Sequence, residues 1–119
     1  MADSKSLTQR LLLLKVEENA RVNGVLDTAT ALTLLESDEP LIRLDTIRMF
    51  ERLKLPSRLI HDKIISMLKT DGNQIVRVGV VAFIGRSCSL DERRTLLEAH
   101  TDGDELVNRI IHTYLPRQS

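Results

Sequence analysis

Several residue types are scarce in this sequence, and each scarcity excludes a class of protein. The single cysteine, Cys88, leaves no intrachain disulfide, unlike the frameworks of small secreted domains. With no tryptophan, two phenylalanines and one tyrosine, the chain has few rings on which single-stranded nucleic acid could stack. No apolar run approaches the ~20 residues of a membrane-spanning helix. We therefore expect a protein of the reducing cytoplasm.

An excess of one charge is also missing. Of the 119 residues, 17 are basic and 17 are acidic, and each half of the chain is itself balanced. A general polyanion-binding protein usually has a basic excess or a basic end, and neither is present. Charged residues make up 29% of the chain and hydrophobic residues 42%, a composition that favours a folded core. The length is that of one domain, residues 1–119, and residues 1–6 do not begin a signal peptide.

Glycine and proline are few, and their positions divide the chain. Five glycines and three prolines fall below the usual ~12%, which favours helices over a strand-rich fold with many turns. Between them, apolar residues recur three or four positions apart, as in amphipathic helices. Pro40 fits the first turn of a helix, and Ser89 and Glu92 form a capping box. We expect seven helices, at residues 5–20, 27–36, 40–53, 57–69, 73–86, 90–99 and 104–115.

Two short segments are also compatible with β-strands. Residues 75–84 are rich in β-branched side chains, and residues 109–115 have the same ambiguity. Periodicity alone does not decide between a strand and a buried helix in runs of this length.

An internal repeat favours helices for both segments. Three stretches align with one another without gaps: 41–52, 75–86 and 106–117. An acidic turn precedes each stretch, at Asp38, Asp71 and Asp102. Because the first stretch spaces its apolar residues as a helix, we expect the same of the other two.

The recurring pattern has the form of a known repeat. Leu35-x-x-Asp38-x-Pro-Leu-Ile-Arg43 returns as Leu68-x-x-Asp71-x-x-x-Ile-Val-Arg77. The pattern resembles HEAT-like repeats of the short kind, in which an acidic turn precedes an apolar-Val-Arg helix start. The third copy departs from it, because Asn108 stands where the arginine is expected.

The resemblance implies an all-α fold of antiparallel helix pairs, stacked into a short, curved α-solenoid. The pairs are expected at residues 27–53, 57–86 and 90–115. Residues 5–20, whose leucines Leu7, Leu11 and Leu14 form a stripe with Leu12 and Val16, are expected to be an N-terminal helix that covers the first pair. Members of the family mostly act as protein-binding scaffolds; a few bind nucleic acid, and some assist cofactor attachment to other proteins.

The repeated arginines have a structural explanation. Arg43 and Arg77 can each reach their own acidic turn or the turn of the next repeat and form an inter-repeat ladder of ion pairs. Asp38 and Asp71 are the expected partners, and carboxylates at helix starts also suit the helix dipole. We prefer this interpretation to a binding site for an anionic ligand.

Histidine and cysteine give no recognisable catalytic or metal motif. The separations among His61, His100 and His112 match no common ligand spacing. His100 beside Asp102 is an alternative weak metal site, and Cys88 with a histidine is an alternative nucleophile pair. A structural role is preferred for both, so we expect no enzyme activity, no cofactor and no metal.

The remaining charged residues supply two candidate surfaces. In the family the concave face binds partners, which assigns a protein-binding role to residues on 57–69 and 90–99: Arg58, His61, Asp62, Arg93 and Arg94. The alternative is a nucleic-acid patch, the densest basic cluster of the chain: Arg48, Arg52, Lys54 and Arg58. We expect a non-catalytic protein-binding module, monomeric or weakly dimeric, with no membrane contact. An enzyme subunit or lyase-like helper is a third possibility, for which no catalytic residues can be named.

Overall fold

The structure is a computed structural model that describes residues 3–115. Within this range all the regular elements are α-helices: α1 (Asp3–Asn23), α2 (Thr28–Leu34), α3 (Pro40–Leu53), α4 (Arg58–Thr70), α5 (Gln74–Ser87), α6 (Leu90–Glu98) and α7 (Glu105–Tyr114). The prediction of an all-α fold with seven helices is confirmed for this part of the chain, although α1 is longer and α2 shorter than expected. None of these helices is long and apolar enough to cross a membrane.

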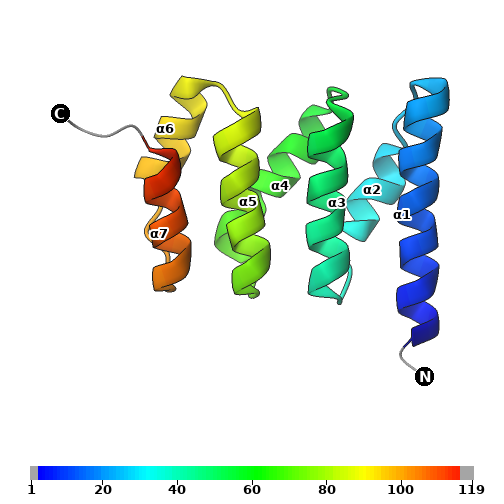
Figure 1. Ribbon diagram of the computed structural model, residues 1–119, viewed down its shortest axis with the longest axis horizontal. Coiled ribbons are helices and arrows are strands. Elements are labelled where there is room, and N and C mark those ends of the chain that lie inside the picture. Colours follow the sequence, from blue (N-terminus) through cyan, green and yellow to red (C-terminus); the bar gives the residue numbers. More distant parts are fainter. Residues whose placement is uncertain (1–2, 116–119) are drawn as a thin grey trace.

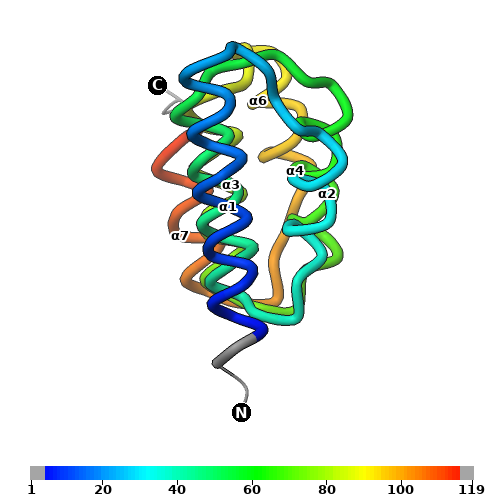
Figure 2. Tube along the Cα trace, turned by 90° about the vertical axis from the view of Figure 1, so that its right-hand side faces the viewer, coloured from blue at the N-terminus to red at the C-terminus, as the bar shows by residue number. Residues whose placement is uncertain are grey.

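The helices alternate between two layers along the chain (Figure 1). Helices α1, α3, α5 and α7 lie side by side in one layer, and α2, α4 and α6 form the second, as the view turned by 90° also shows (Figure 2). The α2–α3, α4–α5 and α6–α7 turns line one edge, which we call the ladder edge. The α1–α2, α3–α4 and α5–α6 turns line the opposite edge, which we call the junction edge.

Helix α5 lies in the middle of the array and contacts α3, α4, α6 and α7. Its side chains Val76, Val80, Phe83 and Ile84 are buried to 1% exposure or less. A helix that is surrounded on several sides needs no continuous polar face, which explains its β-branched, apolar sequence. The strand alternatives are therefore wrong for residues 75–84 and for the described part of 109–115, which helix α7 covers as far as Tyr114.

Two glycines let α5 approach its neighbours in the layer. A Cβ atom on Gly79 would collide with Leu44 of α3, and one on Gly85 would collide with the ring of Tyr114 of α7. A side chain at Gly85 would have to displace the Tyr114 ring, whereas at Gly79 only the tip of the flexible Leu44 side chain would have to move.

Arginines on α3 and α5 connect neighbouring turns of the ladder edge. Arg43 donates from Nε and Nη2 to the Asp71 carboxylate at 2.7 and 2.9 Å, and from Nη1 to the Ser37 carbonyl at 2.7 Å. Arg77 binds the Asp102 carboxylate at 3.0 and 3.2 Å and the Asp71 carbonyl at 2.9 Å. Both carboxylates are only 4% exposed. The predicted ion-pair ladder is confirmed, in the form in which each arginine reaches the next turn.

Neutral hydrogen bonds continue the ladder at both of its ends. The Ser37 hydroxyl donates to Gln9 Oε1 of α1 at 2.7 Å, and Gln9 precedes Arg43 by the same spacing that separates Arg43 from Arg77. Asn108 donates to the Asp102 carbonyl at 2.8 Å and accepts the Asp102 N–H at 2.8 Å. Asn108 thus keeps the hydrogen bond that Arg77 makes to the backbone of its own turn. At the other end, α1 lies beside α3 in the layer as α3 lies beside α5.

In the α2–α3 turn, the residue equivalent to Asp71 and Asp102 is Ser37 and not Asp38, one position away from the residue predicted from the sequence. Ser37 is the equivalent of Asp71 and Asp102, because each accepts the backbone N–H two residues further along and each precedes its ladder residue by six positions. Ser37 is buried, whereas the side chain of Asp38 is 87% exposed and pairs with Lys5 at 3.1 Å. Asp38 is therefore not a member of the ladder.

Helix α1 is apolar on two sides, and the leucines expected to pack are on the outer one. Val16 and Ala20 are buried against the array at 4% exposure. Leu7 and Leu11 stand nine residues earlier, which is two and a half helical turns and places them on the opposite side. Leu7, Leu11 and Leu14 are 58%, 57% and 61% exposed. The prediction that this stripe covers the first helix pair is wrong for these leucines and correct for Val16.

Candidate functional site

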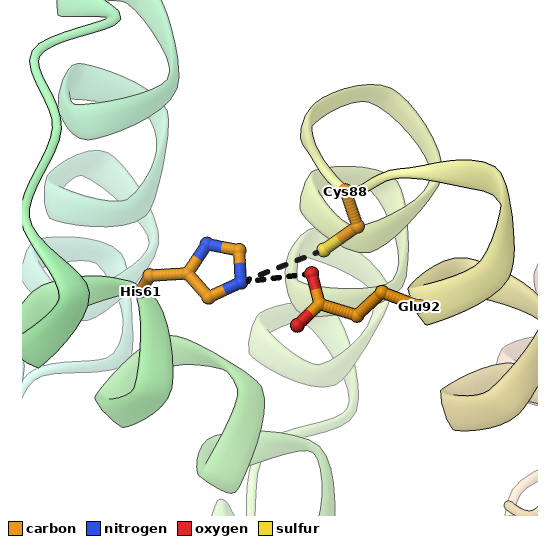
Figure 3. Close-up of side chains that lie close together, drawn as sticks. All are labelled: His61, Cys88 and Glu92. Carbon is orange, nitrogen blue, oxygen red and sulfur yellow. Dashed lines mark hydrogen bonds and ion pairs between the residues drawn. The ribbon is translucent and has the colours of Figure 1, made fainter.

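Three side chains of different chemistry converge at the junction edge (Figure 3). His61 belongs to the first turn of α4, Cys88 directly follows α5, and Glu92 belongs to the first turn of α6. The His61 Nε2 atom lies 3.1 Å from Glu92 Oε1 and 3.8 Å from Cys88 Sγ. The three groups thus point toward one place from three segments of the chain.

Local sequence fixes the positions of these side chains. Ser57 caps α4 and Ser89 caps α6, each accepting a backbone N–H from the first turn of its helix. The Cys88 N–H still donates to the Ile84 carbonyl, so α5 ends immediately before the Ser89 cap. Two equivalent helix starts therefore present their first-turn side chains at the same edge.

The histidine ring is held in place from the core. The rings of His61 and Phe83 are 5.5 Å apart between centroids, with an edge-on angle of 62°. Phe83 is itself 1% exposed, so the imidazole packs against an aromatic ring that is held in the core. The orientation of the ring is therefore determined by packing as well as by its contact with Glu92.

Burial and charge act in opposite directions on the two acids of the cluster. Burial, together with the neighbouring Glu92 carboxylate, raises the pKa of the Cys88 thiol to about 12. Burial alone would raise the pKa of Glu92 too, but the hydrogen bonds and charges of Cys88, His61 and Arg58 outweigh it and lower that pKa. At neutral pH the cluster therefore holds a neutral thiol beside a carboxylate.

This arrangement opposes nucleophilic catalysis by Cys88. A cysteine nucleophile reacts as the thiolate, which requires a lowered pKa rather than a raised one. In a relay, the carboxylate orients one ring nitrogen while the nucleophile uses the other. Here Cys88 and Glu92 both approach Nε2 of His61, so the imidazole cannot connect them in that way.

A charged side chain and an open pocket border the cluster. Arg58 Nη2 lies 3.6 Å from Glu92 Oε2, and its Nε lies 3.1 Å from Asp62 Oδ1. Arg58 and His61 also line a pocket of about 710 Å³ between α3, α4 and α5, whose wall includes Phe50. The cluster is therefore next to space that a ligand can enter.

The five residues predicted to bind a protein partner lie on the two expected helices. Arg58, His61 and Asp62 are on α4, and Arg93 and Arg94 are on α6. His61 joins the cluster, and Arg58 and Asp62 border it. Arg93 donates to the Gly85 carbonyl at 2.9 Å, and its Nε is buried with no hydrogen-bond partner among the described residues. Arg94 pairs with Glu98 at 3.6 Å on the surface.

The alternative nucleic-acid patch is partly neutralised within the chain. Arg52 binds the Glu17 carboxylate with three contacts of 3.1 to 3.2 Å, and Arg58 is paired as above. Arg48 and Lys54 are exposed. Since a phosphate contact needs a free cation, pairing of two of the four members weakens the case for this patch.

His100 and Asp102, considered from the sequence as an alternative weak metal site, are part of the ladder. His100 Nε2 lies 3.0 Å from Asp102 Oδ2, on a carboxylate that Arg77 already holds. Burial would raise the pKa of Asp102, but the hydrogen bonds from His100 and Arg77 lower it overall. These contacts give the pair a structural role.

From the sequence, Cys88 is paired with an unspecified histidine only as an alternative nucleophile pair, and Glu92 is assigned only to the capping box of Ser89. The signal that could have joined them is the pair of serine helix caps, because Ser57 and Ser89 are separated by nearly the length of a repeat and therefore predict first-turn residues at one edge. Comparison of the chain with models of protein families, with characterised proteins and with solved structures finds no match.

Proposed function

We propose that this chain is a protein-binding module built as a short HEAT-like array. The helix pairs would be α2–α3, α4–α5 and α6–α7, stacked beside α1. Three observations support the proposal: the two alternating layers, the recurrence of one sequence pattern at 41–52, 75–86 and 106–117, and the repeated arginine contacts of Arg43 and Arg77. The module is expected to act in the cytoplasm and to be a monomer or a weak dimer without its partner.

The outward face of α1 is the observation that carries the binding function. Leu7, Leu11, Leu14 and Val22 are 58%, 57%, 61% and 73% exposed. Single exposed leucines are common on protein surfaces, whereas an apolar stripe along one helix is typical of a protein contact. Leu7 and Val22 are 15 residues apart, so these side chains extend along about 22 Å of the helix, with Glu18 between Leu14 and Val22.

The occupant that fits this face is an amphipathic helix of a partner protein. Helix α1 packs on α3 through its inner face, and a helix on its outer face would repeat that packing. The exposed side chains Lys15 and Glu18 on α1 carry opposite charges. Mixed charge beside apolar residues suits a protein partner better than a phosphate backbone.

The proposal is tested by capture of partners from cells that naturally contain the protein. The tagged wild-type chain is compared with Leu11→Asp and Leu14→Asp, and the matched control is Leu41→Asp, which changes a 56% exposed leucine on α3. We expect the α1 variants to lose a defined protein that the wild type and the control retain. Circular dichroism confirms that each variant is folded.

Two results would contradict the proposal. One is an identical set of captured proteins for the wild type and both α1 variants. The other is capture of untagged copies of this chain alone, abolished by Leu11→Asp, which would make the outer face a self-association surface. Sedimentation of the purified chain distinguishes that second result, because self-association through α1 would give a stable dimer.

A further inference from the structure

We propose that His61, Cys88 and Glu92 bind a single divalent transition-metal ion with the ligand preferences of zinc. Their potential ligand atoms, an imidazole nitrogen, a sulfur and a carboxylate oxygen, lie within 4.8 Å of one another. Within the described part of the chain, no other group of three histidine, cysteine or acidic side chains comes together in this way. The proposal is independent of partner binding at α1.

Two of the three separations between the ligand atoms are close to the edges of a coordination tetrahedron. With metal–ligand bonds of ~2.0–2.3 Å, tetrahedral geometry places two ligand atoms about 3.3–3.6 Å apart. The observed His61 Nε2–Glu92 Oε1 and His61 Nε2–Cys88 Sγ distances are 3.1 and 3.8 Å. The third separation, between Cys88 Sγ and a Glu92 carboxylate oxygen, is at most 4.8 Å, so side-chain adjustments of up to about 1 Å would let all three atoms reach one ion.

The mixture of ligand types selects the kind of metal. Calcium and magnesium prefer oxygen ligands and are poorly served by sulfur and imidazole. Zinc and cobalt(II) accept sulfur, nitrogen and oxygen together. Three protein ligands also leave a fourth tetrahedral position for water or for a ligand from solution, as in an open zinc site.

The neighbours of the cluster would hold these ligands in position. Arg58 approaches Oε2 of Glu92 at 3.6 Å, which leaves Oε1, the oxygen nearer His61, for the ion. Asp62 balances the charge of Arg58 at 3.1 Å. Phe83 supports the His61 ring from the core. Partners of this kind orient metal ligands and increase affinity.

Metal binding at this site exchanges a proton for the ion and involves no electron transfer. The S–H bond of Cys88 breaks, the sulfur forms a bond to the metal, and the proton passes to solvent. In the metal-free contact Nε2 of His61 is the donor, because a carboxylate only accepts. On metal binding the neutral ring would release that proton to solvent and take one up on Nδ1, which frees the Nε2 lone pair for the ion with no net change in the ring's protons. The bound ion would link α4 to the α5–α6 junction, on the edge opposite the arginine ladder.

Titration of the metal-free chain with cobalt(II) tests the site. Coordination by a thiolate produces a charge-transfer absorption band, and Cys88 is the single cysteine, so the band has one possible source. We expect saturation at one cobalt per chain and displacement of the cobalt by zinc. Zinc should also protect Cys88 from alkylation by iodoacetamide.

The variants separate a built site from adventitious binding to the thiol. His61→Asn and Glu92→Gln should each weaken cobalt binding by at least the ~10–100-fold that loss of an outer partner commonly causes. Cys88→Ser should abolish the band. The matched control is His112→Ala, which removes an exposed histidine of α7 and should leave the titration unchanged. Circular dichroism checks that every variant retains its helices.

Three outcomes would overturn the proposal. The first is the absence of a thiolate band at a large excess of cobalt while the chain is folded. The second is a band whose midpoint is the same in the wild type, His61→Asn and Glu92→Gln, because the thiol would then bind cobalt alone. The third is one cobalt per two chains with dimerisation in sedimentation, which would mean that Cys88 residues from two molecules share the ion.

Discussion

Asp102 on the ladder edge and Glu92 on the junction edge each contact one histidine and one arginine, in opposite settings. Asp102 is held by His100 at 3.0 Å and by Arg77 at 3.0 and 3.2 Å, and its side chain is 4% exposed. Glu92 lies 3.1 Å from His61 and 3.6 Å from an arginine that is 73% exposed, and its own exposure is 27%. The same residue types thus form a buried, tightly hydrogen-bonded group at the ladder edge and a more exposed, loosely bonded group at the junction edge.

The difference indicates which set serves structure and which is available to a ligand. The Asp102 carboxylate also accepts the backbone N–H of Asp104, so hydrogen bonds saturate it, and the pattern recurs at Asp71. Glu92 has looser contacts and has Cys88 beside it. A contact that repeats along the array stabilises the array, whereas a cluster that occurs once is the better candidate for binding.

The largest expected effect comes from removing a repeated ladder carboxylate. Asp71→Ala should lower the free energy of unfolding by about 3–5 kcal/mol, because the guanidinium of Arg43, whose side chain is only 15% exposed, would lose its carboxylate partner. Asp38→Ala, which breaks the exposed ion pair between Lys5 and Asp38, should cost at most ~1 kcal/mol. Urea denaturation followed by circular dichroism measures both. Equal losses for the two variants would show that the ladder is no stronger than a surface ion pair.

The second comparison tests Asp102 directly against Glu92. Asp102→Asn should cost about 1.5–3 kcal/mol at neutral pH, since it weakens charge-assisted hydrogen bonds to His100 and Arg77. Glu92→Gln should cost less, because its arginine partner is exposed and more distant. Thermal unfolding of both variants in the absence of metal gives the order. A larger loss for Glu92→Gln would reverse the roles assigned to the two edges.

Acid should reduce the difference between Asp102→Asn and the wild type. Because the folded pKa of Asp102 is lowered, its contribution to stability is complete above the unfolded pKa of ~3.9 and is lost as pH falls through the folded value. The melting temperatures of the wild type and Asp102→Asn should therefore converge as the pH falls below ~3.9 and through the lower folded pKa of Asp102. A constant gap from neutral to strongly acidic pH would contradict the charge assigned to this residue.

The smallest expected effect is at the neutral end of the ladder. Gln9→Ala removes the hydrogen bond from Ser37 and should cost about 0.5–1.5 kcal/mol, as a neutral pair does. Ser37→Ala should cost more, because it also removes the acceptor of the Glu39 N–H, and the double variant should lose less than the sum of the two, because the residues share one interaction. Additive losses would mean that α1 is held without this contact.

Much of the fold could be predicted from local pattern. The seven helices follow from the apolar spacing, the serine and aspartate caps and the low glycine and proline content, and the arginine ladder follows from the repeat. In the α2–α3 turn, Asp38 was wrongly assigned to the ladder because it is acidic like Asp71, although the 34-residue spacing of the repeat points to Ser37. The face of α1 was misassigned because leucines fill both sides of that helix, and periodicity does not say which side meets the neighbours.

The sequence by itself determined the helices, because capping and 3.6-residue periodicity act between residues close in the chain. It also determined the ladder spacing, which the repeat carries. Only the tertiary structure decided that the outer leucines of α1 are exposed and that His61 lies beside Cys88 and Glu92. His61 lies on α4, Cys88 follows α5 and Glu92 lies on α6, so their meeting depends on how α4 packs against α5 and on where α6 begins. That relation arises from packing between helices, and its only trace in the sequence is the spacing of the helix caps Ser57 and Ser89.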